Sequence, residues 1–342
     1  MALLPSNPTL LDLLHVMQPN GGIETNIVDR LAQRLPILED AVAMEGNETT
    51  GHTFTAESSL PALGWRRFGE GVSSSKGTDE QFTETCAMLE GYSKVDCGLA
   101  ELNGAAAAFR ASQDRKFMTA LKIEAANTLI YGNVKATPEK FHGFMPRFSS
   151  TTGPTGSQIV LLNAAPYGTT PTGITASGTD NATAMFVAWG EGRCYLIYPK
   201  GTIGGIRQKD LGEQVLEDSN GKINTWWMTH WKWNLGLCIE DQRQVSMVRN
   251  IDASALAANT NGAMTALIDA LIDAYYKIFD ETDSRIVLYT NRALAAALHK
   301  GAMLKASSQL TLDTYAGKKI PFFMNIPVRT LDSLGIAEST IT

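Results

Sequence analysis

The sequence predicts an α+β fold in which an extended β-hairpin, one long helix, a mixed middle region and a compact C-terminal block follow one another. Residues 51–97 form two strand-like arms around a polar tip, and residues 103–131 carry one long helical pattern. After Asn250, amphipathic spacing and short apolar runs alternate as helix, strand, helix and strand. We expect two sub-domains, because 342 residues exceed the size at which a single hydrophobic core usually forms.

The composition describes a globular chain with few charges. Apolar residues make up 44% and charged residues 19% of it, against a usual charged fraction of about 25%. The net charge of −6 argues against a broad phosphate-binding face. No apolar run approaches the length of about 18 residues that predicts a transmembrane helix. The first residues lack the basic segment and cleavage site of a signal peptide, so we expect a chain that starts inside a cell and meets no membrane.

The hairpin of residues 51–97 is the most informative part of the chain. Its first arm ends at Phe68, its return arm ends at Cys97, and its tip reads GEGVSSSKGTDE. The alternating arms and the Gly/Ser-rich tip fit a poorly buried ribbon. Such a ribbon is hard to bury in its own domain and is easier to explain if it lies across a neighbouring copy. The pattern therefore favours an assembly protein over an enzyme.

The long helix is predicted from the spacing of apolar residues that share one face. Gly132 supplies its C-terminal stop. The residues of that face are Phe109, Phe117, Leu121, Ala125 and Leu129. The segment before the hairpin, residues 1–50, is broken by prolines and glycines, so we expect short helices or an extended arm there rather than a core.

Three patterns describe the middle of the chain. Residues 150–180 are dense in Gly, Thr, Ser and Pro and predict a surface loop. The Gly-Glu-Gly of residues 190–192, between two apolar runs, predicts a second β-hairpin. Residues 226–239 alternate strongly and predict a half-buried antiparallel strand, with Trp227, Trp231 and Trp233 on one face and His230, Lys232 and Asn234 on the other.

The C-terminal block is predicted as a compact α+β unit. A helix over 262–279 is followed by a strand at 285–289, a helix at 291–300 that stops at Gly301, and strands within 309–331. This block forms the second sub-domain.

No catalytic constellation is present in the sequence. The chain contains no GxSxG, HExxH or DxDxDG motif, and residues 200–205 resemble a phosphate loop only superficially. The four cysteines lie far apart without CxxC spacing, so we interpret them as small buried residues rather than metal ligands. The tryptophans of 226–233 could stack bases or sugars, but their alternation favours a sheet core. We expect no catalytic, cofactor-binding or metal site, and no cofactor.

Several stretches of the chain occur together in a recognisable order. They are GWRRFGEGVSSSKGTDEQFTETCAMLEGYSKVD, LNGAAAAFRASQDRKFMTAL and YGNVKATPEKFHGFMPRF, followed by DLGEQVLEDSNG and the RNID of 249–252. Together they resemble the major capsid proteins of short-tailed phages of the epsilon-15 and Bordetella-phage type, over about residues 20–335. That family is similar to the Hong Kong 97 (HK-97) capsid fold.

The resemblance implies an HK-97-like phage capsid fold with five parts. These are an N-terminal arm at 1–50, an extended loop at 51–97, a peripheral domain at 98–252 that includes a spine helix at 105–131, an axial domain at 253–325, and a C-terminal segment at 326–342 that returns toward the peripheral domain.

In function, the resemblance implies a major capsid protein that is not an enzyme. It would self-assemble into pentamers and hexamers that form the icosahedral head shell around the double-stranded DNA of a phage. The alternative is an encapsulin-like shell protein of a cellular nanocompartment, which uses the same fold to enclose enzymes.

The resemblance also implies partners and a location. Other relatives begin with a built-in scaffolding segment, whereas this chain starts at Met1 without heptads, so a separate scaffolding protein is expected. A portal protein is expected, and so is a decoration or cement protein that docks on residues 150–180. The packaged double-stranded DNA would make no sequence-specific contact, and no membrane takes part. The protein would assemble in the host cytoplasm and end in the capsid shell of the virion.

Six residues are candidates for the subunit interface: Trp65, Arg66, Arg67, Phe68, Lys76 and Glu90. Arginine forms bidentate pairs with carboxylates, and the flanking tryptophan offers apolar area. Strand alternation predicts that one of Arg66 and Arg67 faces solvent, so we expect one functional arginine. Some relatives of this fold cross-link subunits through a lysine of the extended loop. The sequence pairs no acidic catalyst or Asn acceptor with Lys76, so no cross-link is expected here.

Overall fold

The computed structural model describes residues 8, 33–102, 106–153, 155–162, 180–217, 221–258, 263–279, 285–303, 310–315 and 318–341. The helices are α2 (Ile37–Asp40), α3 (Cys97–Glu101), α4 (Ala106–Tyr131), α5 (Phe144–Arg147), α6 (Ala253–Ala258), α7 (Ala263–Tyr275) and α8 (Arg292–Met303). None of the described helices is long and apolar enough to cross a membrane.

The strands of the described residues follow in chain order. They are β1 (Ala43–Glu45), β2 (Gly51–Ser59), β3 (Thr78–Thr85), β4 (Ala87–Asp96), β5 (Ile159–Leu161), β6 (Asn181–Trp189), β7 (Cys194–Tyr198), β8 (Ile206–Glu217), β9 (Ile223–Ile239), β10 (Val245–Asp252), β11 (Arg285–Thr290), β12 (Leu310–Tyr315), β13 (Lys318–Phe323) and β14 (Ile326–Thr330).

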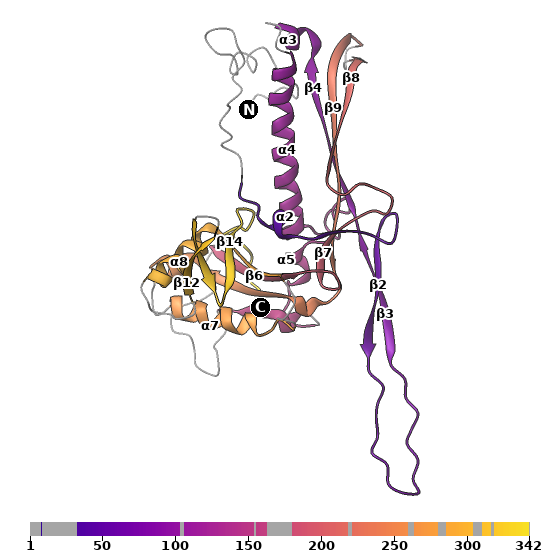
Figure 1. The fold of residues 1–342 in the computed structure, drawn as a ribbon, viewed down its shortest axis with the longest axis vertical. Helices are drawn as coiled ribbons and strands as arrows, with labels where there is room; N and C mark the ends of the chain where they lie inside the picture. The colour runs from indigo at the N-terminus through magenta and orange to yellow at the C-terminus, as the bar shows by residue number, and fades with distance from the viewer. Residues whose placement is uncertain are drawn as a thin grey trace.

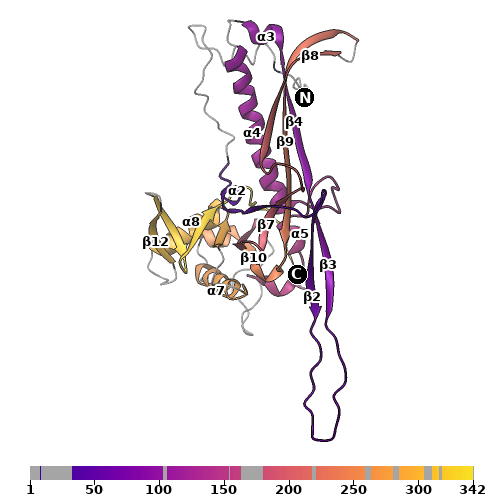
Figure 2. The same cartoon turned by 45° about the vertical axis from the view of Figure 1, so that its right-hand side comes forward.

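Two thin parts project from a central body in opposite directions (Figure 1). The helix α4 rises on one side together with β4, β8 and β9, and the hairpin of β2 and β3 extends from the other side. Figure 2 shows the same arrangement after a turn, with α7, α8 and β12 in the body. The chain therefore presents two separate surfaces at its opposite ends.

The helix α4 packs along the sheet of β4, β9 and β8 through the face that the sequence predicts. Phe117 of that face is partly buried, and the other four residues are buried: Phe109, Leu121, Ala125 and Leu129. The sheet comes so close that a Cβ on Gly91 of β4 would lie 3.3 Å from the Phe117 ring. The predicted long helix is confirmed over Ala106–Tyr131.

The end of α4 is fixed by a close approach of two chain segments at Gly132. The N–H of Gly132 donates to the Thr128 carbonyl at 2.8 Å. A Cβ at this position would lie 2.4 Å from the carbonyl oxygens of both Thr128 and Phe141. Since no side chain fits there, the helix stops where the sequence predicts.

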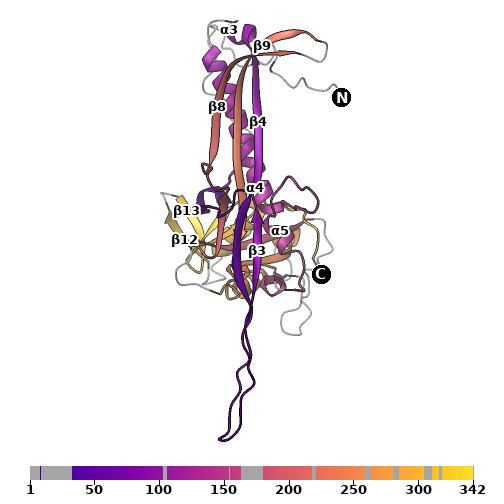
Figure 3. The same cartoon turned by 90° about the vertical axis from the view of Figure 1, so that its right-hand side faces the viewer.

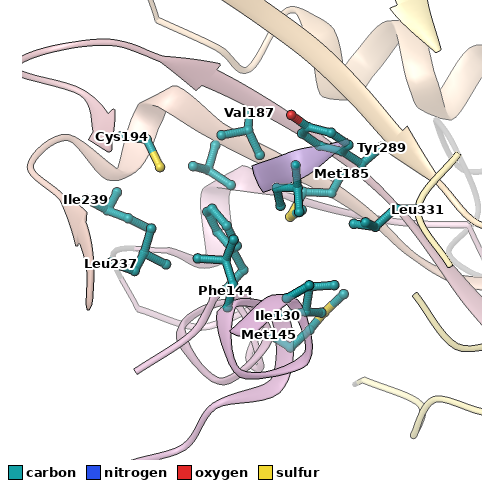
Figure 4. Close-up of a cluster of buried hydrophobic side chains, with 14 of the residues drawn as sticks. Ile130, Phe144, Met145, Met185, Val187, Cys194, Leu237, Ile239, Tyr289 and Leu331 are labelled. Carbon is teal, nitrogen blue, oxygen red and sulfur yellow. The ribbon is translucent and has the colours of Figure 1, made fainter. Parts of the chain in front are cut away.

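The body is built on one sheet that separates two apolar clusters. The described strands run in the order β12–β13–β14–β11–β6–β7–β9–β4, with β10 paired to β6 and β5, β1 to β7, and β8 to β9. The central strand β6 is buried throughout, and its side chains alternate between the two faces. Met185 and Val187 join the cluster next to α4 and α5, and Phe186 joins the cluster next to α7 and α8. Figure 4 shows side chains of the first cluster: Ile130, Phe144, Met145, Val187, Leu237 and Tyr289.

The β-hairpin predicted at residues 190–192 is wrong. The strands β6 and β7 share one bridge, Trp189 with Cys194, and that pair is parallel. The strand β6 lies between β10 and β11, and β7 pairs with β9 and β1. Because β6 is buried on both faces, strands distant in sequence supply its neighbours, and the local turn does not decide the pairing.

Three other predictions differ in part. Residues 159–161 of the predicted surface loop form β5, which pairs with β10, while residues 154 and 163–179 lie outside the described residues. The helix α8 continues through the buried Gly301 to Met303, because packing overrides the cost of about 1 kcal/mol for glycine in a helix. The sheet also crosses the boundary predicted at 252/253, since β6 pairs with β11.

Asp40 pins the described end of the N-terminal arm to the body. Its buried carboxylate accepts hydrogen bonds from Arg285 Nη2 at 2.7 Å and from the Tyr289 hydroxyl at 2.8 Å. Arg329 Nη1 lies 3.2 Å from the same carboxylate. Burial, with Asp40 as the second cause, raises the pKa of Tyr289, so its hydroxyl stays a donor. Residues 1–7 and 9–32 of the predicted arm lie outside the described residues.

The substitution Asp40→Ala should lower the free energy of unfolding of the unassembled subunit by about 3 kcal/mol, because it leaves the buried Tyr289 hydroxyl without its acceptor and Arg329 with only the more distant carboxylate of Glu39. Urea denaturation followed by tryptophan fluorescence measures the change. Glu39→Ala is the matched control, since the Glu39 side chain is 79% exposed and its distant pairing with Arg329 contributes little. An equal loss of unfolding free energy in both variants would show that Asp40 does not fix the N-terminal arm to the body.

Candidate functional site

The hairpin exposes large apolar side chains on a segment without a core. The strands β2 and β3, here called the hairpin shaft, pair antiparallel from Gly51 opposite Thr85 to Ser59 opposite Thr78. Residues 60–77, here called the hairpin tip, connect them and project far from the body (Figure 3). Four large apolar residues of the tip are 80% or more exposed: Leu60, Leu63, Trp65 and Phe68. Apolar side chains gathered in this way mark an interaction surface.

Five of the six predicted interface residues lie in the hairpin tip. Lys76 lies on the way back to β3, and the other four are consecutive: Trp65, Arg66, Arg67 and Phe68. All five are exposed. Residues 60–77 form no strand, so alternation cannot place one arginine inward and the other outward as predicted. The chain turns here instead, and the N–H of Glu70 donates to the carbonyl of Arg67 at 3.2 Å.

The return arm predicted over 81–97 divides at Cys86. The strand β3 ends at Thr85, and β4 then pairs with β9 from Ala87 opposite Leu235 to Asp96 opposite Trp226. The physical reason is that β9 and α4 offer β4 a larger sheet and a helix to cover one face. The two-stranded hairpin therefore ends at Thr85 rather than at Cys97.

A bidentate ion pair anchors the base of the hairpin shaft. Glu84 of β3 faces Arg147 of α5, with Oε1 2.5 Å from Nη1 and Oε2 2.6 Å from Nη2. Both side chains are 15% exposed, so the pair is shielded from water. Arg147 also donates to the His142 carbonyl at 3.1 Å. Such fork-like pairing fixes orientation as well as distance, so it sets the direction in which the shaft leaves the body.

A second anchor joins β2 to the body through His52. The Tyr195 hydroxyl donates to Glu240, and its oxygen lies 3.2 Å from His52 Nε2. The N–H of Asn47 donates to His52 Nδ1 at 3.3 Å. The neutral ring therefore carries its proton on Nε2, the atom that faces Tyr195. Burial, followed by the hydrogen bond to Glu240, raises the pKa of Tyr195, so the hydroxyl keeps the proton that it donates.

The same region brings three potential metal ligands, His52, Cys238 and Glu240, within 4.8 Å of one another. Their chemistry fits a hydrogen-bonded anchor better than a metal centre. A metal on Nε2 of His52 would need the proton on Nδ1, but Nδ1 faces an N–H donor. Burial also raises the pKa of the Cys238 thiol to about 12, which opposes a thiolate ligand.

Glu90, the sixth predicted interface residue, lies on β4 and not on the hairpin. Its carboxylate is 2.8 Å from Lys232 Nζ and 3.2 Å from His230 Nε2. The hydrogen bond from Lys232 is the main cause that holds the pKa of Glu90 below its ordinary value. Tyr92 stacks on His230, with ring centroids 4.5 Å apart. Glu90 is thus neutralised by its own chain, on the sheet face opposite α4.

The arrangement of β9 confirms its predicted alternation. Trp231 is opposite Gly91, which lies under Phe117 of α4, and it is 2% exposed. His230 and Lys232 face the other side, as predicted. The tryptophans therefore belong to the packing between sheet and helix.

The sequence did not predict the two anchors of the hairpin base, because each anchor joins segments that are distant in the chain. One signal was present: alternation in β3 places Glu84 on the same ribbon face as Phe82, which stacks on Phe54. A charge on an apolar face needs a partner where that face is buried, but Phe82 itself is 41% exposed, so this signal is weak. Nothing in the local pattern identifies Arg147 as that partner.

Known proteins match this chain over nearly its whole length. A family model described as major capsid protein GP7 matches residues 18–342. A chain in the solved structure of bacteriophage Epsilon15 is 30% identical, with a TM-score of 0.76, and the match covers 100% of this chain and 99% of that one. No curated protein matches the chain.

Two other solved structures are similar to a lower degree. The capsid of bacteriophage JBD30 is 11% identical, with a TM-score of 0.48 over 91% of this chain and 95% of that one. An encapsulin from Synechococcus elongatus PCC 7942 is 10% identical, with a TM-score of 0.42 over 66% of this chain and 92% of that one.

The family match and the Epsilon15 structure confirm the predicted resemblance and the HK-97-like fold. They also favour a phage capsid over the nanocompartment alternative. With a family match that leaves out only the first 17 residues, this chain belongs to the major capsid protein GP7 family.

Proposed function

We propose that this chain builds the icosahedral head shell of a phage from pentamers and hexamers, with the hairpin of each copy lying over a neighbouring copy. The hairpin tip carries the proposal, because Leu63, Trp65 and Phe68 are each 93% or more exposed. A second copy can bury these side chains, and burying a large apolar side chain contributes roughly 1.5–3 kcal/mol. The interface residues of this contact are five of the six predicted ones, with Arg66, Arg67 and Lys76 as charged donors beside Trp65 and Phe68; Glu90 is not among them, because it lies on β4.

The parts of the fold are assigned within the same proposal. The extended loop is the hairpin of 51–85. The peripheral domain is the predicted 98–252 with α4 as its spine helix, and β4 joins it through its pairing with β9. The axial domain of 253–325 contains α6–α8 with β11, β12 and β13. The C-terminal segment of 326–342 returns toward the peripheral domain, and its contact with the end of α4 supports this: the Tyr131 hydroxyl donates to Glu338 at 2.7 Å.

Other components complete the head. A separate scaffolding protein guides assembly, a portal protein occupies one vertex, and a decoration protein docks on the outer surface. The chain performs no catalysis, assembles in the host cytoplasm, and confines the packaged double-stranded DNA without sequence-specific contact. Its net charge of −6 supports the last point, because a negative wall does not adhere to phosphates.

Light scattering and negative-stain microscopy of the purified protein, alone and co-expressed with its genomic neighbours, test the proposal. We expect closed shells or rings of five or six copies, with DNA rather than enzymes enclosed in particles from infected cells. A stable monomer or dimer under every condition would contradict it.

Replacing both Trp65 and Phe68 by alanine should prevent assembly while the subunit stays folded. Losing two buried aromatic contacts removes at least about 3 kcal/mol from each interface, which weakens it by roughly 100-fold. Sedimentation gives the assembled fraction, and circular dichroism checks the fold. Ser73→Ala with Ser74→Ala is the matched control, since both serines are exposed in the same tip. Shell formation at the wild-type level by the aromatic variant would exclude the tip as a contact.

Lys76 should form no covalent cross-link between subunits. Assembled particles, boiled in detergent and run on a denaturing gel, should give one band at the mass of the monomer, 37.0 kDa. The variant Lys76→Arg should give the same band and the same particles. A ladder of higher bands that disappears in Lys76→Arg would overturn this expectation.

A further inference from the structure

A pocket of about 790 Å³ lies between the end of α4 and the C-terminal segment of the chain. Residues 333–341 of that segment, here called the C-terminal strap, supply one wall, and the end of α4 with the chain up to Ser149 supplies the other. The volume falls in the range of roughly 300–1,000 Å³ that is typical of small-ligand sites. The buried side chain of Arg249, on β10, also lines the pocket. The pocket therefore has the size of a binding site and a buried positive charge in its lining.

The guanidinium of Arg249 has too few partners for a buried charge. Its side chain is 7% exposed. Nη1 lies 3.1 Å from the sulfur of Met145 and donates to the Phe148 carbonyl at 3.4 Å, and Nη2 lies 3.7 Å from the Glu338 carboxylate, which is beyond hydrogen-bond distance. A guanidinium carries five N–H donors, but Nη2 and Nε of Arg249 donate no hydrogen bond to the described residues. A buried charge that is only partly paired is costly, so an acceptor is missing here.

Glu338 does not supply that acceptor, because other groups hold its carboxylate. The Tyr131 hydroxyl donates to one carboxylate oxygen at 2.7 Å, and the Thr183 hydroxyl donates to the other. The N–H of Glu338 donates to the Asn181 carbonyl at 3.0 Å, which fixes the strap at this residue. Burial lowers the pKa of Arg249, and the nearby Glu338 does not fully offset this effect. The positive charge is therefore only partly compensated within the chain.

Two further polar atoms of the pocket residues lack partners. The Ser333 hydroxyl and Nδ1 of His142 are buried and form no hydrogen bond with the described residues. Native proteins leave few buried polar atoms unpaired, so two such atoms in the lining of one pocket need an explanation. Burial, followed by the charge of Arg147, lowers the pKa of His142, so its ring is neutral and Nδ1 can either donate or accept. A bound molecule would supply the missing partners.

The ligand chemistry that fits these groups best is a carboxylate. Its two coplanar oxygens match the fork of a guanidinium, and it also accepts from a hydroxyl and from an ammonium group. Ser333 offers the hydroxyl, and the exposed Lys135 offers the ammonium group. A phosphate dianion fits less well, since the Glu338 carboxylate lies 3.7 Å from Arg249 and repels the additional charge. The carbon chain that bears the carboxylate would meet the apolar residues of the pocket: Met145, Pro146 and Ile336.

We propose that this pocket is a carboxylate-binding site, in which Arg249, Ser333 and Lys135 hold the ligand beside the C-terminal strap. The inference goes beyond the proposed function, because it concerns one copy of the chain and holds whether or not copies assemble.

Two sources share this ligand chemistry: a free small carboxylate and the acidic side chain of a peptide. The backbone N–H groups of Ala337, Ser339 and Thr340 donate no backbone hydrogen bond among the described residues. An extended peptide would therefore also pair with the strap, as peptides do with the edge of a sheet. A free carboxylate would use the side chains alone.

Calorimetric titration of the purified full-length protein tests the site with four probes. These are glutarate, the peptide acetyl-Val-Glu-Val-amide, the matched peptide acetyl-Val-Gln-Val-amide and inorganic phosphate. We expect the better of glutarate and the glutamate peptide to bind with a Kd of about 1 mM or tighter. The glutamine peptide should bind at least about tenfold more weakly, because it forms no charged pair with Arg249. Phosphate should also bind more weakly than the better carboxylate.

Ser333→Ala and its matched control Ser112→Ala separate binding from folding. Each change removes a buried hydroxyl that has no partner among the described residues, but Ser112 lies on α4 and does not line the pocket. Both variants should unfold at the wild-type temperature or above, since neither loses a hydrogen bond. Only Ser333→Ala should weaken carboxylate binding, by at least about fivefold.

Substitutions of the charged groups complete the design. Arg249→Lys keeps the charge and removes the fork, so it should weaken carboxylate binding by at least about tenfold. Lys135→Gln removes an exposed charge and should weaken binding by roughly twofold to fivefold. Lys122→Gln is its control, since Lys122 is exposed on α4 and does not line the pocket, and it should leave binding unchanged.

The relative affinities identify the source of the ligand. If the glutamate peptide binds more tightly than glutarate, the site takes an acidic segment of a protein; otherwise it takes a free carboxylate. Either result supports the inference.

Three results would overturn it. They are no saturable heat with glutarate or the glutamate peptide up to about 10 mM, unchanged binding in both Ser333→Ala and Arg249→Lys, and a glutamine peptide or phosphate that binds as tightly as the better carboxylate. Because the titration does not require assembly, chains that bind a carboxylate but never form shells would contradict the proposed function alone.

Discussion

The hairpin of β2 and β3 has no core of its own, because two strands alone cannot bury their side chains. Its direction comes from the body, through the Glu84–Arg147 pair and the hydrogen bonds of His52 with Tyr195. Both contacts lie at the base of the ribbon, so the shaft and tip beyond them are left in water. The direction of the shaft depends on these polar contacts together with Phe54, which packs against the buried apolar cluster of Tyr195, Ile197 and Cys238.

The opposite projection is stabilised in a different way. The helix α4 covers one face of its sheet, and a small apolar cluster of Val95, Ala100 and Phe109 closes its far end. Arg110 adds to this by pairing with Asp210 while its guanidinium lies 4.4 Å from the Trp227 ring. Among the described residues, no helix covers the other face of this sheet. The body thus holds most of the apolar core, and both projections present surfaces that a single copy leaves open.

Local patterns predicted those elements whose packing is decided within one segment. The spacing from Phe109 to Leu129 gave α4 its buried face, and alternation gave β9 its two sides. The same patterns failed where distant segments choose the partner. The residues of β3 and β4 have the pattern of one continuous strand. After Cys86, however, β4 pairs with β9 and packs against α4 instead of continuing the hairpin. The turn at 190–192 looks like a hairpin, but β10 and β11 flank β6.

The candidate site shows the same limit. The poor burial of the hairpin was predictable, because its Gly/Ser-rich tip cannot pack, but Trp65 and Phe68 were placed on a strand-like arm, whereas β2 ends at Ser59. The placement of Glu90 was not, because its environment is made by Lys232 and His230 across a strand pair. The alignment of Glu90, Lys232 and Arg207 on the sheet face opposite α4 depends on the register of three strands, which no single segment encodes.

The residues that anchor the hairpin base are synthesised later than the hairpin itself. A ribosome makes the apolar tip of residues 60–68 well before Arg147, Tyr195 and Glu240, the groups that hold the hairpin in place. At a synthesis rate of 5–20 residues per second, roughly 10–30 s separate Phe68 from Glu240. During that interval the nascent chain carries a contact surface with no fixed direction. Neighbouring ribosomes on one messenger therefore carry hairpins with exposed apolar side chains and no fixed direction. Chaperones that bind short apolar segments would act on this chain before its own body can hold the hairpin.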